Sequence, residues 1–233
     1  MQSAYRSVLA IAAILFVATL IAAQEPETTR AVAGGGISVA GWKGKIDASE
    51  EAKGLVLNNA KFFKDGSALR FTTGPAVTYW NPANTASGNY TVKATFKEPQ
   101  YMNLNNHPHP YGIVIAGNDL ETGQQSFLYC AAYGNGTFIV RGFGPAPFQM
   151  NGRGTASPAV NKAAGPGEAV IQEIAVSVKS AQIECAINGT VVGAYPKSAV
   201  VTAGKLKSTD GVYGLRFAHN TEGLVTGLTV TKQ

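Results

Sequence analysis

Hydrophobic and polar residues alternate with a period of two in one segment after another of this chain. Residues 89–97 are the clearest case, with polar side chains interleaved between Tyr90, Val92, Ala94 and Phe96. The same alternation recurs over 173–179, 182–188 and 213–217. A period of two places one apolar and one polar face on a β-strand, and no apolar stripe at helical spacing persists beyond two turns. The pattern therefore predicts an all-β chain.

Turn sequences divide the predicted strands. Asn135-Gly136 and Asn188-Gly189 are typical of tight two-residue hairpins, because both residues of such a turn need positive φ angles. Many short strands joined in this way predict a two-sheet antiparallel β-sandwich of the jelly-roll type. The one long irregular stretch, residues 142–167, is rich in Gly, Pro, Ala and Ser. Long loops inside a compact domain are usually functional or mobile, and we expect the same here.

The beginning of the chain has the pattern of a secretory signal peptide. A lone basic residue, Arg6, precedes an apolar run over 8–20, and small residues follow at Ala22 and Ala23. We expect cleavage after Ala23, a linker over 24–36 and a single β-sandwich domain over 37–233. The apolar run is short for a membrane span of roughly 20 residues, so the mature protein is predicted to be periplasmic or secreted, without membrane association. An uncleaved anchor is the alternative.

Charge and cysteine content indicate which partners the protein can bind and whether it can form a disulfide. The chain has 19 basic and 14 acidic residues, but the basic residues are scattered and form no stripe that could follow a phosphate backbone. We therefore expect no nucleic-acid binding. Cys130 and Cys185 are the two cysteines, and export to an oxidising compartment permits a disulfide between them. The alternative is that both are small buried apolar residues in strands.

A family resemblance supports the predicted sandwich. The opening Gly-Trp-Lys-Gly at 41–44, the run His-Pro-His-Pro-Tyr-Gly-Ile-Val-Ile-Ala-Gly at 107–117 and the hairpin over 125–141 resemble a concanavalin A-like lectin/glucanase domain, and the strands over 187–192 and 211–217 are similar to its last strands. Within that superfamily the chain resembles uncharacterised bacterial secreted proteins and, more distantly, the 3-keto-disaccharide hydrolase domain. The resemblance implies two stacked sheets, one of them concave, and sugar binding as the commonest use.

Catalysis by paired carboxylates is not favoured by the sequence. Glycoside hydrolysis generally requires two carboxyl groups across the bond, and the Glu-x-Asp-x-x-Glu run of the superfamily's glucanases does not occur here. Asp119 and Glu121 have the nearest spacing, but Asn, Asp and Gly around them indicate a turn. We therefore expect non-catalytic glycan binding on one sheet face and identify no catalytic residue. Hydrolysis of a (keto-)disaccharide and a structural or adhesive role in the cell envelope are the alternatives.

Two histidines in an extended segment are candidates for ligand contact. His107 and His109 project to the same side of an extended backbone, which Pro108 and Pro110 enforce. They could hold a polar ligand or a metal ion, or the segment could simply be a rigid loop. Two ligands do not complete a metal site, and the position of His219 relative to the pair does not follow from the sequence. We therefore predict no metal site.

Aromatic and basic residues complete the set of predicted contacts with a glycan or cell-envelope polysaccharide, because rings stack on sugars and polar groups bind their hydroxyls. Core packing is the alternative for the aromatic residues. The candidate ligand-binding residues are Trp80, His107, His109, Tyr111 and Arg141. No cofactor is expected beyond a structural calcium ion, for which oxygens of Asp47, Asn118 or Asp210 could serve.

Overall fold

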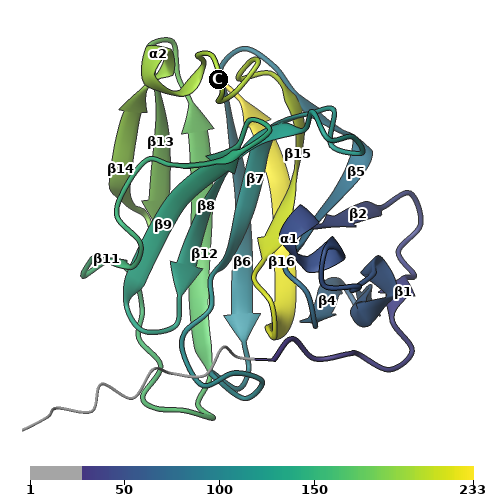
Figure 1. Cartoon of the computed structure of the whole chain (residues 1–233). Helices are drawn as coiled ribbons and strands as arrows, with labels where there is room; N and C mark the ends of the chain where they lie inside the picture. The colour runs from purple at the N-terminus through teal and green to yellow at the C-terminus, as the bar shows by residue number, and fades with distance from the viewer. Residues whose placement is uncertain (1–27) are drawn as a thin grey trace, which may run out of the picture.

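The structure is a computed structural model that describes residues 28–233, so the predicted signal peptide lies outside the described residues. Two β-sheets pack face to face, and β9, β8 and β7 of one sheet lie in front of β13, β12 and β6 of the other in Figure 1. The first sheet has the order β1 (Gly36–Ile37), β3 (Ala60–Asp65), β4 (Ala68–Thr73), β16 (Glu222–Lys232), β6 (Tyr90–Glu98), β12 (Val170–Val178), β13 (Gln182–Ile187) and β14 (Thr190–Pro196).

The second sheet has the order β10 (Pro147–Gln149), β9 (Thr137–Phe143), β8 (Ser126–Tyr133), β7 (Tyr111–Asn118), β15 (Gly211–Phe217), β5 (Val77–Ala86) and β2 (Lys43–Ile46), with β11 (Thr155–Ala156) also paired to β9. Neighbouring strands are antiparallel except β1 and β3, which are parallel. The helical elements of residues 28–233 are the short α1 (Ala48–Glu51), η1 (Leu57–Asn59) and α2 (Lys197–Val200). The predicted antiparallel β-sandwich is therefore confirmed. Within the described residues, no helix has the length and apolarity that a membrane span requires.

The two predicted hairpin turns differ in length. Ile187 pairs with Thr190, and Asn188 and Gly189 between them have φ angles of 50° and 81°, which confirms the two-residue turn. On the other hairpin, Tyr133 pairs with Thr137, so the loop has three residues. The prediction of a two-residue turn at Asn135-Gly136 was wrong, because Gly134 also lies outside the ladder.

Aromatic rings from the two sheets meet in pairs across the interior. Phe62 of β3 stacks on Tyr79 of β5 with ring centroids 4.3 Å apart. Two further pairs, Phe71–Phe217 at 3.6 Å and Phe96–Tyr111 at 5.6 Å, also join one strand of each sheet. All six rings are buried. Aromatic pairs add roughly 0.5–1.5 kcal/mol each to the hydrophobic free energy of burying their area, so these contacts fix how the sheets face each other.

A disulfide also connects the sheets. Cys130 of β8 and Cys185 of β13 form the bond, with their Cα atoms 5.9 Å apart. The predicted disulfide is thus confirmed, and both cysteines are also buried among apolar residues of the interior. In the chain-entropy model, a cross-link of this loop length lowers the free energy of the folded state relative to the unfolded one by about 4 kcal/mol.

Part of the predicted linker packs against the sandwich. The backbone N–H of Arg30 donates to Oδ1 of Asn220 at 2.9 Å, and Nδ2 of Asn220 donates to the carbonyl of Thr28 at 3.1 Å. Asn220 follows β15, is fully buried and has a φ angle of 49°. Residues 28–30 therefore help to hold the turn that ends β15, next to His219.

Glu98 is a buried carboxyl group at the end of β6. It is 4% exposed, its Oε1 accepts a hydrogen bond from the backbone N–H of Met102 at 3.4 Å, and its Oε2 is buried without a hydrogen-bond partner among the described residues. Burial raises the pKa of Glu98 from 4.5 to about 7, and the nearby charge of Glu222 adds to the rise. The folded protein therefore binds this proton more tightly than the unfolded chain does.

This difference predicts how stability depends on pH. A raised carboxyl pKa contributes stability that is complete below about pH 4.5 and is lost as the pH rises through about 7. At about 1.4 kcal/mol per pKa unit, the loss is of the order of 3 kcal/mol. Urea denaturation across this pH range should show that Glu98→Gln removes this part of the decline. Parallel pH profiles for the two proteins would contradict the prediction.

Candidate functional site

The outer face of the second sheet, which points away from the first sheet, is unusually apolar. All eight residues of β8 are buried. Leu128, Cys130 and Ala132 point into the interior between the sheets, and the alternate positions belong to a separate cluster. We call this the outer cluster, and it consists of Trp80, Val114, Leu120, Phe127, Tyr129, Ala131, Tyr133, Ile139 and Phe143. Its aromatic residues cover the strands on the side where a polar face would be expected.

A pocket of about 430 Å³ opens at one end of this face. Its floor comes from outward-facing residues of β8, β9 and β15, and its rim comes from α1, from the segment before β7 and from the loop after β10. The polar and aromatic residues that line it are Asp47, Glu50, His107, His109, Tyr129, Tyr133, Arg141, Arg153, Arg216 and His219. We refer to it as the main pocket.

A buried ion pair forms one wall of the main pocket. Arg216 of β15 is 6% exposed, and its guanidinium bonds the carboxylate of Asp47 and Oγ1 of Thr78. Burial alone would lower the pKa of Arg216, but the Asp47 carboxylate and the Tyr129 hydroxyl raise it above its ordinary value. The guanidinium also lies 5.7 Å from the centre of the Tyr129 ring. The charge of Arg216 is therefore neutralised within the protein.

Two further arginines carry positive charge into the main pocket. Within residues 28–233, neither Arg141 nor Arg153 has a carboxylate at ion-pair distance. Nε of Arg141 is buried without an acceptor in the described part of the chain, while Arg153 is exposed. Burial raises the pKa of Tyr133 to about 12, although both arginine charges act on its hydroxyl in the opposite direction. The phenol therefore keeps its proton near neutral pH and can donate a hydrogen bond.

Strand register brings the three histidines of the protein together. Tyr111 of β7 pairs with Phe217 of β15 in an antiparallel ladder, and the backbone N–H of Ala218 donates to the carbonyl of Pro110 at 3.0 Å. Continuing this register by two residues places His219 opposite His109. His107 lies two residues earlier on the same extended segment, on the same side as His109. The ring-to-ring distances are 4.3 Å for 107 and 109, and 4.2 Å for 109 and 219.

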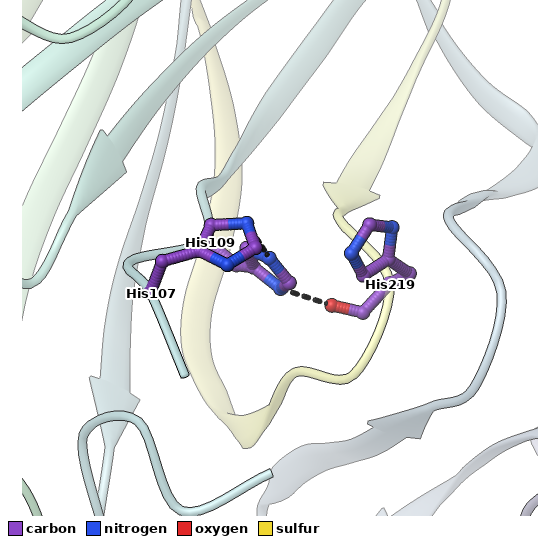
Figure 2. Close-up of side chains that lie close together, drawn as sticks. All are labelled: His107, His109 and His219. Atoms are coloured by element: carbon purple, nitrogen blue, oxygen red, sulfur yellow. Dashed lines mark hydrogen bonds between the residues drawn. The ribbon is translucent and has the colours of Figure 1, made fainter. Parts of the chain in front are cut away.

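Hydrogen bonds orient His109 within this cluster, and Figure 2 marks those between the three histidines with dashed lines. Nδ1 of His109 lies 2.5 Å from the carbonyl oxygen of His219, and its Nε2 lies 2.8 Å from Nε2 of His107. Because a carbonyl oxygen can only accept, Nδ1 of His109 carries a proton. Burial and the adjacent His219 lower the pKa of His109 to about 3. The ring is therefore neutral near pH 7, and its Nε2 lone pair points at His107.

The structure brings together three of the five predicted ligand-binding residues. His107, His109 and Arg141 line the main pocket. Tyr111 instead packs in the interior on Phe96 and is 1% exposed, so it is a core residue. Trp80 lies within β5 and belongs to the outer cluster, but it lines two other hollows and not the main pocket.

The acidic residues considered for catalysis or for calcium lie elsewhere, apart from Asp47. Asp119 pairs with Lys207, and Glu121 pairs with Lys43 at 2.7 Å, so the predicted turn holds them away from the main pocket. The calcium candidates Asn118 and Asp210 contact each other through an amide-to-carbonyl bond at 3.0 Å. Asp47 itself is the partner of Arg216.

Sequence reasoning missed several pocket residues for a common reason. Tyr129 and Tyr133 stand in a strand that is apolar on both faces, so its alternation does not reveal which residues point outward. Arg216 is a single basic residue in an otherwise apolar strand, and it was the one sequence feature that could have indicated a polar site on the outer face. Arg153 lies in the irregular stretch that we expected to be functional or mobile. The loop folds back on β9 and delivers this arginine to the pocket.

Comparisons with solved structures agree with the topology. The chain is similar to the carbohydrate-binding module CBM66 from Bacillus subtilis, with 7% identity, a TM-score of 0.54, and 85% of this chain and 99% of that chain covered. It is also similar to an endo-β-1,3-glucanase from Pyrococcus furiosus, with 11% identity, a TM-score of 0.52 and 86% and 91% coverage. A third similar structure is a Bacillus subtilis protein of unknown function with a galectin-like fold. It has 12% identity and a TM-score of 0.50, and the match covers 82% of this chain and 89% of that chain.

These likenesses define the class of fold. The chain has a galectin-like β-sandwich fold, which is the kind of fold that the resemblance over 41–141, 187–192 and 211–217 implied. No protein-family model matches the chain, and no curated protein sequence matches it either. The more distant resemblance to the 3-keto-disaccharide hydrolase domain therefore stays a prediction.

The buried ion pair generates a stability prediction. Asp47→Asn leaves Arg216 buried without a counter-charge, and breaking a buried pair in this way costs roughly 3 kcal/mol or more. The matched control is Asp65→Asn, because Asp65 pairs with Arg70 where both side chains are more than 40% exposed, and such pairs contribute about 0–1 kcal/mol. Urea denaturation of both variants measures the difference. Equal, small losses would show that Arg216 does not depend on Asp47.

Proposed function

We propose that this protein is a non-catalytic glycan-binding β-sandwich whose main pocket binds a sugar that carries a carboxylate. The observation that carries this proposal is the pair Arg141 and Arg153, two arginines without an ion-pair partner in the described chain, beside Tyr129 and Tyr133. Guanidinium groups bind carboxylates with two parallel hydrogen bonds, and these bonds are stronger than neutral ones.

The remaining walls suit the rest of a sugar ring. Phenol hydroxyls and imidazole nitrogens exchange hydrogen bonds with sugar hydroxyls, and the aromatic rings offer apolar area to the C–H face. Two of the structures that share this fold are a carbohydrate-binding module and a glucanase, which supports a carbohydrate ligand. A cell-envelope polysaccharide containing uronic acids has the required chemistry.

The carboxylates of the main pocket favour binding over hydrolysis. A hydrolase needs one carboxylic acid and one carboxylate across the scissile bond. Asp47 is held by Arg216, and Glu50 is 4% exposed and lies 3.5 Å from Lys53. The main pocket therefore does not present these two groups as an exposed acid and an exposed carboxylate on either side of a sugar bond.

The proposed setting is outside the cytoplasm. The Cys130–Cys185 disulfide and the absence of a membrane-spanning helix among residues 28–233 are compatible with an extracellular protein. Disulfides persist in oxidising compartments. We propose export through the signal peptide predicted over 1–23, followed by function in the periplasm or beyond it.

Binding to a glycan array and calorimetry test the proposal. The untagged protein should retain oligosaccharides that contain uronic acid and should bind their neutral counterparts more weakly. Arg141→Gln and Arg153→Gln should each weaken binding by about tenfold or more, since hydrogen bonds to charged groups contribute roughly 1.5–3 kcal/mol. The matched control is Arg70→Gln, which removes the same charge on β4, outside the main pocket, and should leave affinity unchanged.

Three results would contradict the proposal. Equal binding of neutral and acidic sugars would show that the arginines do not bind a sugar carboxylate. Retention of no glycan would instead favour a structural or adhesive role. Mass spectrometry of the retained sugar provides the third check, because a cleaved product would make the protein an enzyme.

A further inference from the structure

The three histidines form a cluster of nitrogen donors at the edge of the main pocket. One ring nitrogen from each of His107, His109 and His219 lies within 4.8 Å of the others. Their burial differs, since His109 is buried, His219 is half-buried and His107 is exposed. Figure 2 shows a nitrogen of the His219 ring directed toward the other two rings. They come from two segments that the β7–β15 register holds together, so their proximity follows from the fold.

The hydrogen bonds around two of these rings favour a cation between them. Nδ1 of His109 donates to the carbonyl of His219, and Nδ1 of His107 lies 2.7 Å from the amide oxygen Oδ1 of Asn106. Oxygen atoms of this kind accept hydrogen bonds, so both Nδ1 atoms act as donors. The two Nε2 atoms then direct lone pairs at each other across 2.8 Å. Lone pairs at that distance repel unless a proton on one of the two nitrogens, or a metal ion between the rings, satisfies both.

We propose that His107, His109 and His219 bind a transition-metal ion, with Zn²⁺ as the best match. Imidazole nitrogen suits Zn²⁺, whereas calcium and magnesium take oxygen ligands. Nitrogen ligands at about 2.0–2.1 Å from a tetrahedral zinc ion lie roughly 3.3 Å from one another. The nitrogens now lie within 4.8 Å of one another, so metal binding requires the rings to rotate toward that spacing, and exposed His107 has the most freedom to do so.

Groups around the cluster match the usual surroundings of a zinc site. Metal-bound histidines commonly donate their other nitrogen to a carbonyl or a carboxylate. His109 has this bond to the carbonyl of His219, and Nδ1 of His219 lies 3.7 Å from Oε1 of the buried Glu50. All three histidines face the main pocket. Three protein ligands leave a fourth position open, where water or an oxygen of a bound ligand can coordinate.

Calorimetry with ZnCl₂ tests the proposal without any sugar present. The untagged protein, freed of metal by a chelator, should bind one Zn²⁺ per chain, and Zn²⁺ should raise the melting temperature because it binds the folded state. His107→Gln and His219→Gln should each weaken binding at least tenfold, and Glu50→Gln by about tenfold as an outer contact. The control is Glu121→Gln, whose exposed carboxylate pairs with Lys43 outside the main pocket, and it should bind as the wild type does.

Two outcomes would overturn the proposal: no saturable binding at one Zn²⁺ per chain, or wild-type affinity in both histidine variants. His109 is buried, so the test relies on His107 and His219, where a loss of folding is less of a concern. Metal binding and glycan binding are measured separately, the latter also with chelator present. A failure of one proposal therefore does not count against the other.

Discussion

The packing of aromatic rings between the two sheets is the constraint on which the rest of the structure depends. Phe62, Phe71 and Phe96 of the first sheet each meet a ring of the second sheet, and the Cys130–Cys185 disulfide joins β8 to β13 in the same interior. These contacts set the distance and orientation of the sheets. They also decide which side chains of β7, β8 and β15 point inward and, by alternation, which ones reach the outer face.

The main pocket follows from that alternation. With Leu128 and Cys130 committed to the interior, Tyr129 and Tyr133 must point outward. Arg216 lies between two inward residues of β15 and is likewise directed to the outer face, where Asp47 neutralises it. The same β7–β15 pairing that aligns Tyr111 with Phe217 brings His219 to His109. One set of strand registers thus builds both the arginine-lined and the histidine-lined parts of the pocket.

The sequence predicted the class of fold better than it predicted the site. Period-two alternation and the Asn188-Gly189 turn predicted an antiparallel sandwich, and the structure has both features. The two cysteines permitted either a disulfide or two unlinked buried side chains, and the structure has the disulfide. Contacts between segments that are distant in the sequence could not be predicted from it. The approach of His219 to the histidine pair depends on which strands are neighbours, and Tyr111 differs from Tyr129 only in the face of its strand. Local patterns carry neither piece of information.

The most direct measurement of the central claim is a crystal structure of the protein with a bound oligogalacturonide. The account predicts the sugar in the main pocket, with a carboxylate at hydrogen-bond distance, about 3 Å, from the guanidinium of Arg141 or Arg153. A sugar bound on the first sheet, or beside Trp80 and away from the histidines, would contradict it.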